Sequence, residues 1–175
     1  MILAIFLLAV RTERRLANAL FAIFLILLAI DVSGWLIESP EFLYSWPNAL
    51  RTAVTFLQMP FFTGFIAATC FAGTRLRLWH GAHALPFFGA LAFTLPGDQL
   101  PFGKNGNVEY PLHYLTQDEY TLLFTALDIQ YYLYIAAAIA ILWQFRSVFR
   151  RHYANIRSKI FAWLAWLVAI SLIAN

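Results

Sequence analysis

Charged residues are scarce in this sequence, and their scarcity excludes an ordinary water-soluble domain. Only 12% of the 175 residues are Asp, Glu, Lys or Arg, whereas 62% are hydrophobic and the mean hydropathy is +0.69. In soluble domains about a quarter of the residues are charged, because their surface faces water. A chain so poor in charge is expected to bury its apolar surface in a lipid bilayer, and its length indicates one domain.

Cysteine and catalytic motifs are also nearly absent. The one cysteine, Cys70, lies in an apolar run, so an intramolecular disulfide is excluded, and there is no Cys/His spacing of the zinc type. The sequence has no nucleophile elbow, no Gly-rich phosphate loop and no motif of paired carboxylates. His113 with Asp118 and Glu119 is the best remaining acid–base set. We therefore predict that the chain is not an enzyme and holds no cofactor or metal.

What the sequence does contain is a series of apolar segments. A helix needs about 20 residues to span the hydrocarbon core of a bilayer. The expected segments are a partial one at 1–10, followed by 16–37, 50–72, 79–95, 119–145 and 160–174. They predict an all-α fold, a polytopic transmembrane helical bundle of about five to six spans. The first segment rises only about 15 Å, which favours a helix whose start is missing over a short half-spanning helix.

The loops between these segments fall into two sets that differ in charge. Residues 11–15, the stretch around Arg75 and Arg77, and residues 146–159 together hold ten of the twelve Lys and Arg residues and one acid. Loops 38–49 and 96–118, with Glu119 adjoining, hold six acids and one lysine. The two sets alternate along the chain. The positive-inside rule then predicts that the basic loops are cytoplasmic and that loops 38–49 and 96–118 are extracytoplasmic.

Polar side chains inside the spans are the candidates for ligand binding, because such groups are costly in lipid. They share a similar depth in the outer halves of the spans, where a cavity open to the exterior would accept a small ligand. The predicted ligand-binding residues are Asp31, Gln58, Asp128, Gln130, Tyr131 and Tyr134, with Tyr132 beside them. The alternative is that these groups hydrogen-bond one another or nearby backbone and hold the helices together.

Three further features have structural interpretations. Pro60 is expected to kink its helix, because proline lacks an N–H and clashes with the preceding turn. His80 and His83 are three residues apart near the cytoplasmic interface, where anchoring is favoured over a metal site. The basic loop 146–159 is explained by topology and suits anionic lipid headgroups, so contact with nucleic acid is not expected there.

Several short motifs resemble the N-terminal membrane domain of bacterial AraC-type transcriptional regulators that carry a multi-helix sensor. The motifs are a basic turn after the first span, a proline that opens an aromatic stretch, a His-x-Leu-Pro-Phe element, a Gln- and Tyr-bearing span and a Trp-Leu-rich span. In this sequence they are Arg11-Thr-Glu-Arg-Arg-Leu-Ala-Asn, Met59-Pro60-Phe61-Phe62, His83-Ala84-Leu85-Pro86-Phe87, Gln130 to Tyr134, and Lys159-Ile-Phe-Ala-Trp-Leu-Ala-Trp-Leu.

In such regulators the membrane part resembles a sensor, and a cytoplasmic helix-turn-helix domain at the C-terminus binds promoter DNA. The resemblance implies a sensor module in the bacterial inner (cytoplasmic) membrane that binds a small extracytoplasmic ligand. This sequence contains no helix-turn-helix, so direct contact with nucleic acid is not expected from this chain. We also expect that a last helix, which would return the chain to the cytoplasm, is missing.

Two other functions are open from the sequence, a small membrane transporter and a structural subunit of a membrane complex. A transporter predicts polar groups through the full depth of the membrane, whereas the polar groups here are confined to the outer half. Apolar surfaces that face lipid and those that face a partner look alike in a sequence. A structural subunit and a homodimer are therefore both compatible with these residues.

Overall fold

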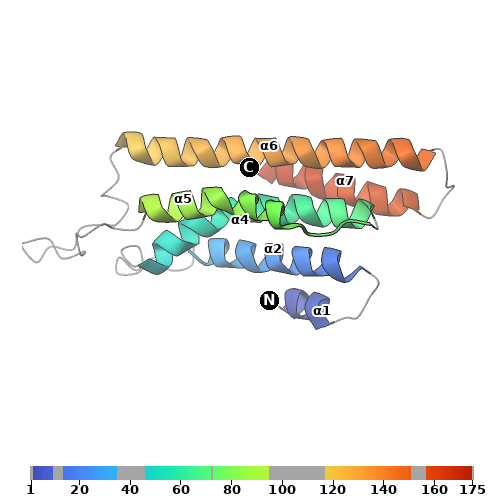
Figure 1. Ribbon diagram of the computed structural model, residues 1–175, viewed down its shortest axis with the longest axis horizontal. Coiled ribbons are helices and arrows are strands. Elements are labelled where there is room, and N and C mark those ends of the chain that lie inside the picture. Colours follow the sequence, from blue (N-terminus) through green and yellow to red (C-terminus); the bar gives the residue numbers. More distant parts are fainter. Residues whose placement is uncertain are drawn as a thin grey trace, which may run out of the picture.

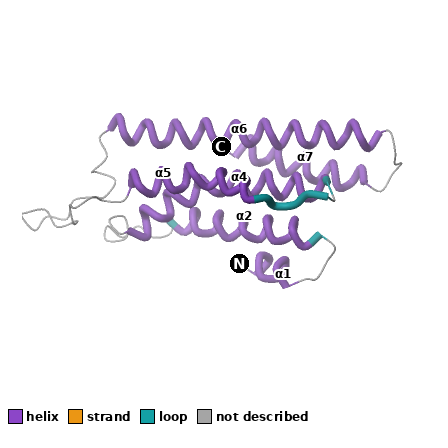
Figure 2. The backbone as a smooth tube through the Cα atoms, viewed as in Figure 1, coloured by secondary structure: helices purple, strands orange, loops and turns teal. Residues whose placement is uncertain are grey.

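The computed structural model describes residues 2–9, 14–34, 46–71, 73–94, 117–150 and 157–174. Every regular element in these ranges is a helix, as Figure 2 shows. The α-helices are α1 (Ile2–Ala9), α2 (Arg15–Ser33), α4 (Trp46–Cys70), α5 (Leu85–Thr94), α6 (Gln117–Arg150) and α7 (Arg157–Ala174), and a 3-10 helix, η1 (Leu78–Ala84), precedes α5. The predicted all-α fold is confirmed for these residues.

Three of the helices are long and apolar enough to cross a membrane. They are Arg15–Ser33 in α2, Pro47–Cys70 in α4 and Asp118–Ser147 in α6, which correspond to the predicted segments 16–37, 50–72 and 119–145. The apolar part of α7, Phe161–Ile173, is shorter. The predicted loops 38–49 and 96–118 lie mostly outside the described residues; of these two loops, only 46–49 and 117–118 are described, and they form the first residues of α4 and α6.

The segment predicted as one span at 79–95 is divided between η1 and the ten-residue helix α5. Pro86 gives the physical reason, because a proline has no N–H with which to continue a helix that precedes it. The ring is tolerated in the first turn of an α-helix, where the missing N–H has no partner in any case. The α-helix therefore begins at Leu85, and the residues before it form the tighter 3-10 turn.

Helix α4 is central to the bundle and packs against α2, α5, η1 and α6, while α1 packs on α2 and α7 packs on α6 (Figure 1). Helices α4 and α6 run parallel to each other, and α2, α5 and α7 run in the opposite direction (Figure 1). At one end of the bundle lie Ser33, Trp46, Thr94 and Gln117, where helices α2 and α5 finish and α4 and α6 begin. We call this end the acidic end, because Asp31, Asp118 and Glu119 lie near it.

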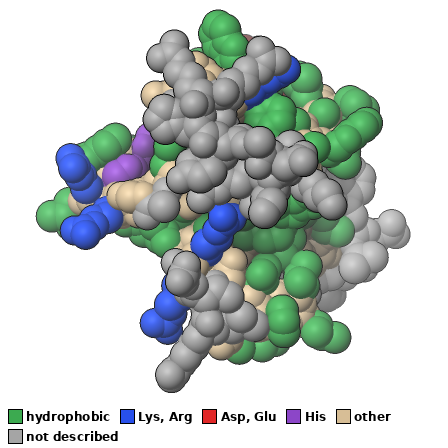
Figure 3. All heavy atoms as spheres, turned by 90° about the vertical axis from the view of Figure 1, so that its right-hand side faces the viewer, with side chains coloured by type: hydrophobic (Ala, Val, Ile, Leu, Met, Phe, Trp, Pro, Cys, Tyr) green, Lys and Arg blue, Asp and Glu red, His purple; other side chains and the backbone are tan. Residues whose placement is uncertain are grey.

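The opposite end carries most of the described arginines, and we call it the basic end. Its exposed arginines are Arg14, Arg15, Arg75, Arg77 and Arg146. Viewed from this side, arginine and histidine side chains are visible at the surface (Figure 3). The charge difference between the predicted loop sets thus continues in the described helix ends.

Two clusters of buried side chains form the core. The basic-half core joins α2, α4, α6 and α7, and consists of Ala17, Leu20, Met59, Phe62, Phe65, Ile66, Cys70, Ile135, Ala138, Leu142, Phe145, Leu164 and Val168. Aromatic rings extend it, since Phe21 stacks on Phe65 with centroids 4.5 Å apart and Trp163 meets Phe65 edge-on. The smaller acidic-half core joins α4, α5 and α6 through Ala53, Phe56, Ala90 and Leu123.

The outside of the bundle is also strongly apolar. Leu133 and Trp143 on α6 are 65% and 76% exposed, and Ile173 on α7 is 83% exposed. A soluble monomer rarely exposes more than a few hundred Å² of contiguous apolar surface. Helices that are apolar on all sides belong in a lipid bilayer or a large core. The exposed surface therefore supports the interpretation of α2, α4 and α6 as membrane helices.

Candidate functional site

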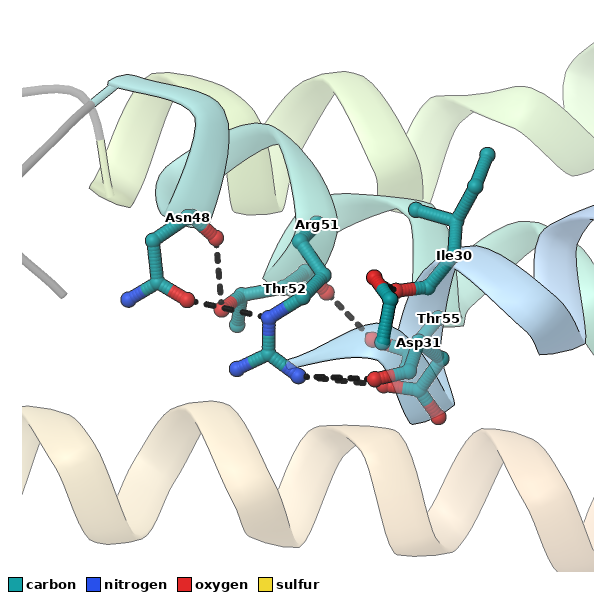
Figure 4. A network of polar contacts seen from close by, with 7 residues as sticks. Ile30, Asp31, Asn48, Arg51, Thr52 and Thr55 are labelled. Atoms are coloured by element: carbon teal, nitrogen blue, oxygen red, sulfur yellow. Dashed lines mark hydrogen bonds and ion pairs between the residues drawn. The ribbon is translucent and has the colours of Figure 1, made fainter. Parts of the chain in front are cut away.

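Asp31 and Arg51 form an ion pair between α2 and α4 near the acidic end. Arg51 Nη1 lies 3.5 Å from Asp31 Oδ1 and donates to the carbonyl oxygen of Asp31 at 3.1 Å. The Nε group of the same guanidinium donates to Asn48 Oδ1 at 3.0 Å, and Asn48 is only 1% exposed. Figure 4 shows the guanidinium between Asn48 on its own helix and Asp31 at the end of α2. One cation therefore ties the ends of two helices together.

The position of Arg51 follows from the C-terminal end of α2. The last carbonyl groups of a helix lack intrahelical donors and carry partial negative charge, so a cation there is favourable. The guanidinium fits because Gly34 has no side chain, since a Cβ at this position would lie 2.3 Å from Arg51 Nη1. The sequence interpretation did not include Arg51 among the site residues. A usable signal was present, because Asp31 near the end of one predicted span and Arg51 near the start of the next can form an ion pair.

Gln58 lies on the same face of α4 as Arg51, seven residues further along, which is about 10 Å along the helix axis. Phe62 and Phe65 share this face and meet Phe24 and Phe21 of α2. The amide nitrogen of Gln58 is buried and has no hydrogen-bond partner among the described residues. The structure therefore brings two of the predicted residues, Asp31 and Gln58, to the interface between α2 and α4. The amide nitrogen of Gln58 is an unused donor there, further from the acidic end than the ion pair.

Gln130 lies on another side of α4, and its contact is explained by Pro60. A proline within a helix cannot donate to the carbonyl four residues before it, which here is the carbonyl of Phe56. Gln130 Nε2, from α6, donates to this oxygen at 2.7 Å. Neighbouring helices commonly satisfy backbone groups that a proline frees in membrane helices. The first turns of α4 slant relative to the rest of the helix in Figure 1, as expected for a proline kink.

The two predicted tyrosines form contacts elsewhere on α6. The hydroxyl of Tyr131 donates to the carbonyl of Ser171 on α7 and lies 2.9 Å from Ser171 Oγ. The hydroxyl of Tyr134 is 2.6 Å from His83 Nδ1 on η1, and the carbonyl of Tyr134 accepts from Thr63 Oγ1 at 3.3 Å. These contacts connect α6 with three neighbouring elements, which is the role that the alternative interpretation assigns to them.

His80 belongs to the turn of η1 itself, because its Nδ1 accepts from the backbone N–H of Arg77 at 2.9 Å. Its ring also stacks on Trp79, with centroids 4.0 Å apart. Within the described helices, no three His, Cys, Asp or Glu side chains come together as metal ligands.

Asp128 and Tyr132 differ from the other predicted residues, because both are exposed on the outside of α6. Asp128 makes no hydrogen bond or ion pair with another described residue, and Tyr132 is 52% exposed. The predicted set is thus distributed over four places: the α2–α4 interface, the α4–α6 interface, the contacts of α6 with α7 and η1, and the outer face of α6.

Comparison of the chain with protein-family models, with curated proteins and with solved structures finds no match.

Proposed function

We propose that this chain is a membrane-embedded sensor module of the bacterial inner membrane, with about five to six spans and its basic end in the cytoplasm. The three membrane-length helices and the apolar outer surface support the embedding. The orientation is supported by the exposed arginines at the basic end, because cytoplasmic loops carry an excess of Lys and Arg.

The ligand site that we propose lies between α2 and α4, in the acidic half of the bundle. The observation that carries it is the buried amide nitrogen of Gln58, a donor without an acceptor. A buried polar group without a partner costs free energy, so a molecule that supplies an acceptor there gains affinity. Arg51 lies two turns away on the same face. The chemistry that fits two donors is a small molecule with a carbonyl or carboxylate oxygen.

Ligand binding at this interface would act on the helix that contacts most of the bundle. A molecule that accepts from Gln58 and competes with Asp31 for Arg51 would change how α2 packs on α4. The kink at Pro60 lies two residues beyond Gln58, so a change there would also alter the path of α4 toward the basic end. Two packings with different ligand affinity are what a sensor requires.

The test is thermal unfolding of the full chain in lipid nanodiscs with a panel of small carboxylates and primary amides. We expect at least one compound to raise the midpoint of the wild type and not that of Gln58→Leu. Gln144→Leu is the matched control, because Gln144 is an exposed glutamine on α6. Equal responses of the wild type and Gln58→Leu to every compound would show that this amide binds no ligand and would overturn the site.

The output that we propose is control of transcription, as the resemblance to AraC-type sensor domains implies. The intact mass of the protein purified from its own membranes tests this output. A mass well above 20.0 kDa, with a helix-turn-helix in the additional sequence, would support it. A mass near 20.0 kDa would leave this chain without a DNA-binding domain and would overturn the proposal for this chain.

A second candidate function is a structural subunit of a larger membrane complex. The exposed carboxylate of Asp128 on the outside of a membrane-length helix favours it. A small transporter is favoured by none of the described contacts, since Asp31 and Arg51 lie near the acidic end and the basic-half core is apolar.

A further inference from the structure

Asp128 occupies an unusual position for a carboxylate. The apolar span of α6 runs from Asp118 to Ser147, and Asp128 lies about 7 Å from its midpoint along the axis. The hydrocarbon core extends about 15 Å on each side of the bilayer centre. The aspartate side chain is too short to reach the interface from this depth. An exposed carboxylate here therefore meets lipid chains unless another group covers it, and that exposure is costly.

None of the described helices covers Asp128. Helix α7 packs on α6 and reaches Tyr131 through Ser171, but Asp128 lies one turn nearer the acidic end. It has no described helix over it and no partner among the described side chains. Thr125, Asp128 and Tyr132 have the spacing of one helix face, and all three are exposed. Ala136 continues the same face and would allow another helix to approach closely.

The charges of this chain disfavour a second copy of the chain as the partner that binds this face. A symmetric dimer in one membrane would place Asp128 beside Asp128 of the partner subunit, at the same depth and with the same charge. The described arginines cannot compensate, because Arg51 is paired with Asp31 on a different interface and the others lie at the basic end. Among the described residues no unpaired cation lies on this face, which favours a different protein as the source of the complementary group.

We propose that the α6 face formed by Thr125, Asp128, Tyr132 and Ala136 docks a transmembrane helix of a partner protein that presents a Lys or Arg side chain inside the bilayer. The partner cation would pair with the Asp128 carboxylate, and the hydroxyls of Thr125 and Tyr132 would complete a polar contact in an otherwise apolar interface. Charged residues in membrane segments are commonly paired in this way. The inference rests on the proposed membrane embedding but not on the ligand site at Gln58.

The test uses the full chain in liposomes with designed single-span peptides as probes. The peptides are leucine-rich helices that carry one Lys, one Leu or one Asp at the depth of Asp128, and energy transfer between labelled chain and peptide reports association. We expect the wild type to bind the Lys peptide about tenfold more tightly than the Leu peptide. Asp128→Asn should remove this preference, and Asp128→Lys should transfer it to the Asp peptide.

Asp118→Asn is the matched control, because Asp118 is an exposed acid in the first turn of the same helix, and it should keep the preference for the Lys peptide. Equal binding of the Lys and Leu peptides by the wild type would overturn the proposal. Self-association of the wild type that Asp128→Asn abolishes would also overturn it, because a second copy would then occupy the face. Loss of ligand response in Gln58→Leu has no bearing on these outcomes.

Discussion

The basic half and the acidic half of this bundle are held together by different contacts. In the basic half, side chains of α2, α4, α6 and α7 form one continuous apolar core with stacked and edge-on aromatic rings. In the acidic half the apolar core is small, and the ion pair of Asp31 with Arg51 and the bond from Gln130 to Phe56 connect the helices.

This difference indicates which half of the bundle can respond to a ligand. Helices in a membrane gain little from the hydrophobic effect, so they associate through close packing and through hydrogen bonds. A ligand can replace a hydrogen bond by offering one of its own, but it cannot easily replace an interlocked core. We therefore infer that the basic half is a fixed frame and that the acidic half is adjustable.

The largest expected effect is a loss of unfolding free energy from a substitution in the basic half. Ile66 is fully buried in the basic-half core, and Ile66→Ala should lower the free energy of unfolding by about 3 kcal/mol through the cavity that it leaves. Leu123→Ala, in the smaller acidic-half core, should cost less. Unfolding of the full chain in mixed detergent micelles measures both, with exposed Leu133→Ala as the control. A larger loss for Leu123→Ala than for Ile66→Ala would reverse the comparison.

The next effect concerns the ion pair of the acidic half. Arg51→Met should cost about 2 kcal/mol, because it leaves the Asp31 carboxylate and the Asn48 side chain without this donor. Adding Asp31→Leu to Arg51→Met should restore much of the stability, since the unpaired charge is then removed. The same unfolding measurement checks both variants. If Arg51→Met has no effect, polar contacts do not hold the acidic half together.

The smallest expected effect concerns the proline kink. Gln130→Leu should cost about 1 kcal/mol, because the Phe56 carbonyl that Pro60 frees then has no donor from α6. In a Pro60→Ala background the helix supplies its own N–H, so the same Gln130→Leu change should cost much less. A double-mutant cycle measures this coupling. Purely additive losses would mean that Gln130 does not compensate for the proline.

Hydropathy alone was enough to predict the positions of α2, α4 and α6, because long apolar runs are a strong signal. It was not enough for the segment 79–95, where Pro86 divides the predicted span into η1 and α5. The charge pattern anticipated that arginines gather at one end of the bundle. The number of spans and the orientation of the chain stay predictions.

The candidate site was less accessible to sequence analysis, because the pairing of helices depends on packing. Polar residues at similar depth were predicted to share a cavity, yet a depth says nothing about which side of a helix a residue occupies. Gln58 and Gln130 are at similar depth, but Gln58 lies on the side of α4 that faces α2, whereas Gln130 of α6 contacts another side of α4. Asp128 faces outward. Ligand binding by the predicted set has not been tested and stays a prediction.

The parallel course of α4 and α6 has a consequence for the order in which the protein is made. A short hairpin loop cannot join two parallel helices, so the chain first returns through η1 and α5, and α6 is synthesised after them. During that interval the Phe56 carbonyl freed by Pro60 has no donor from Gln130. The nascent α4 therefore keeps an unsatisfied carbonyl at its kink until Gln130, 74 residues after Phe56, has been synthesised and α6 packs against α4.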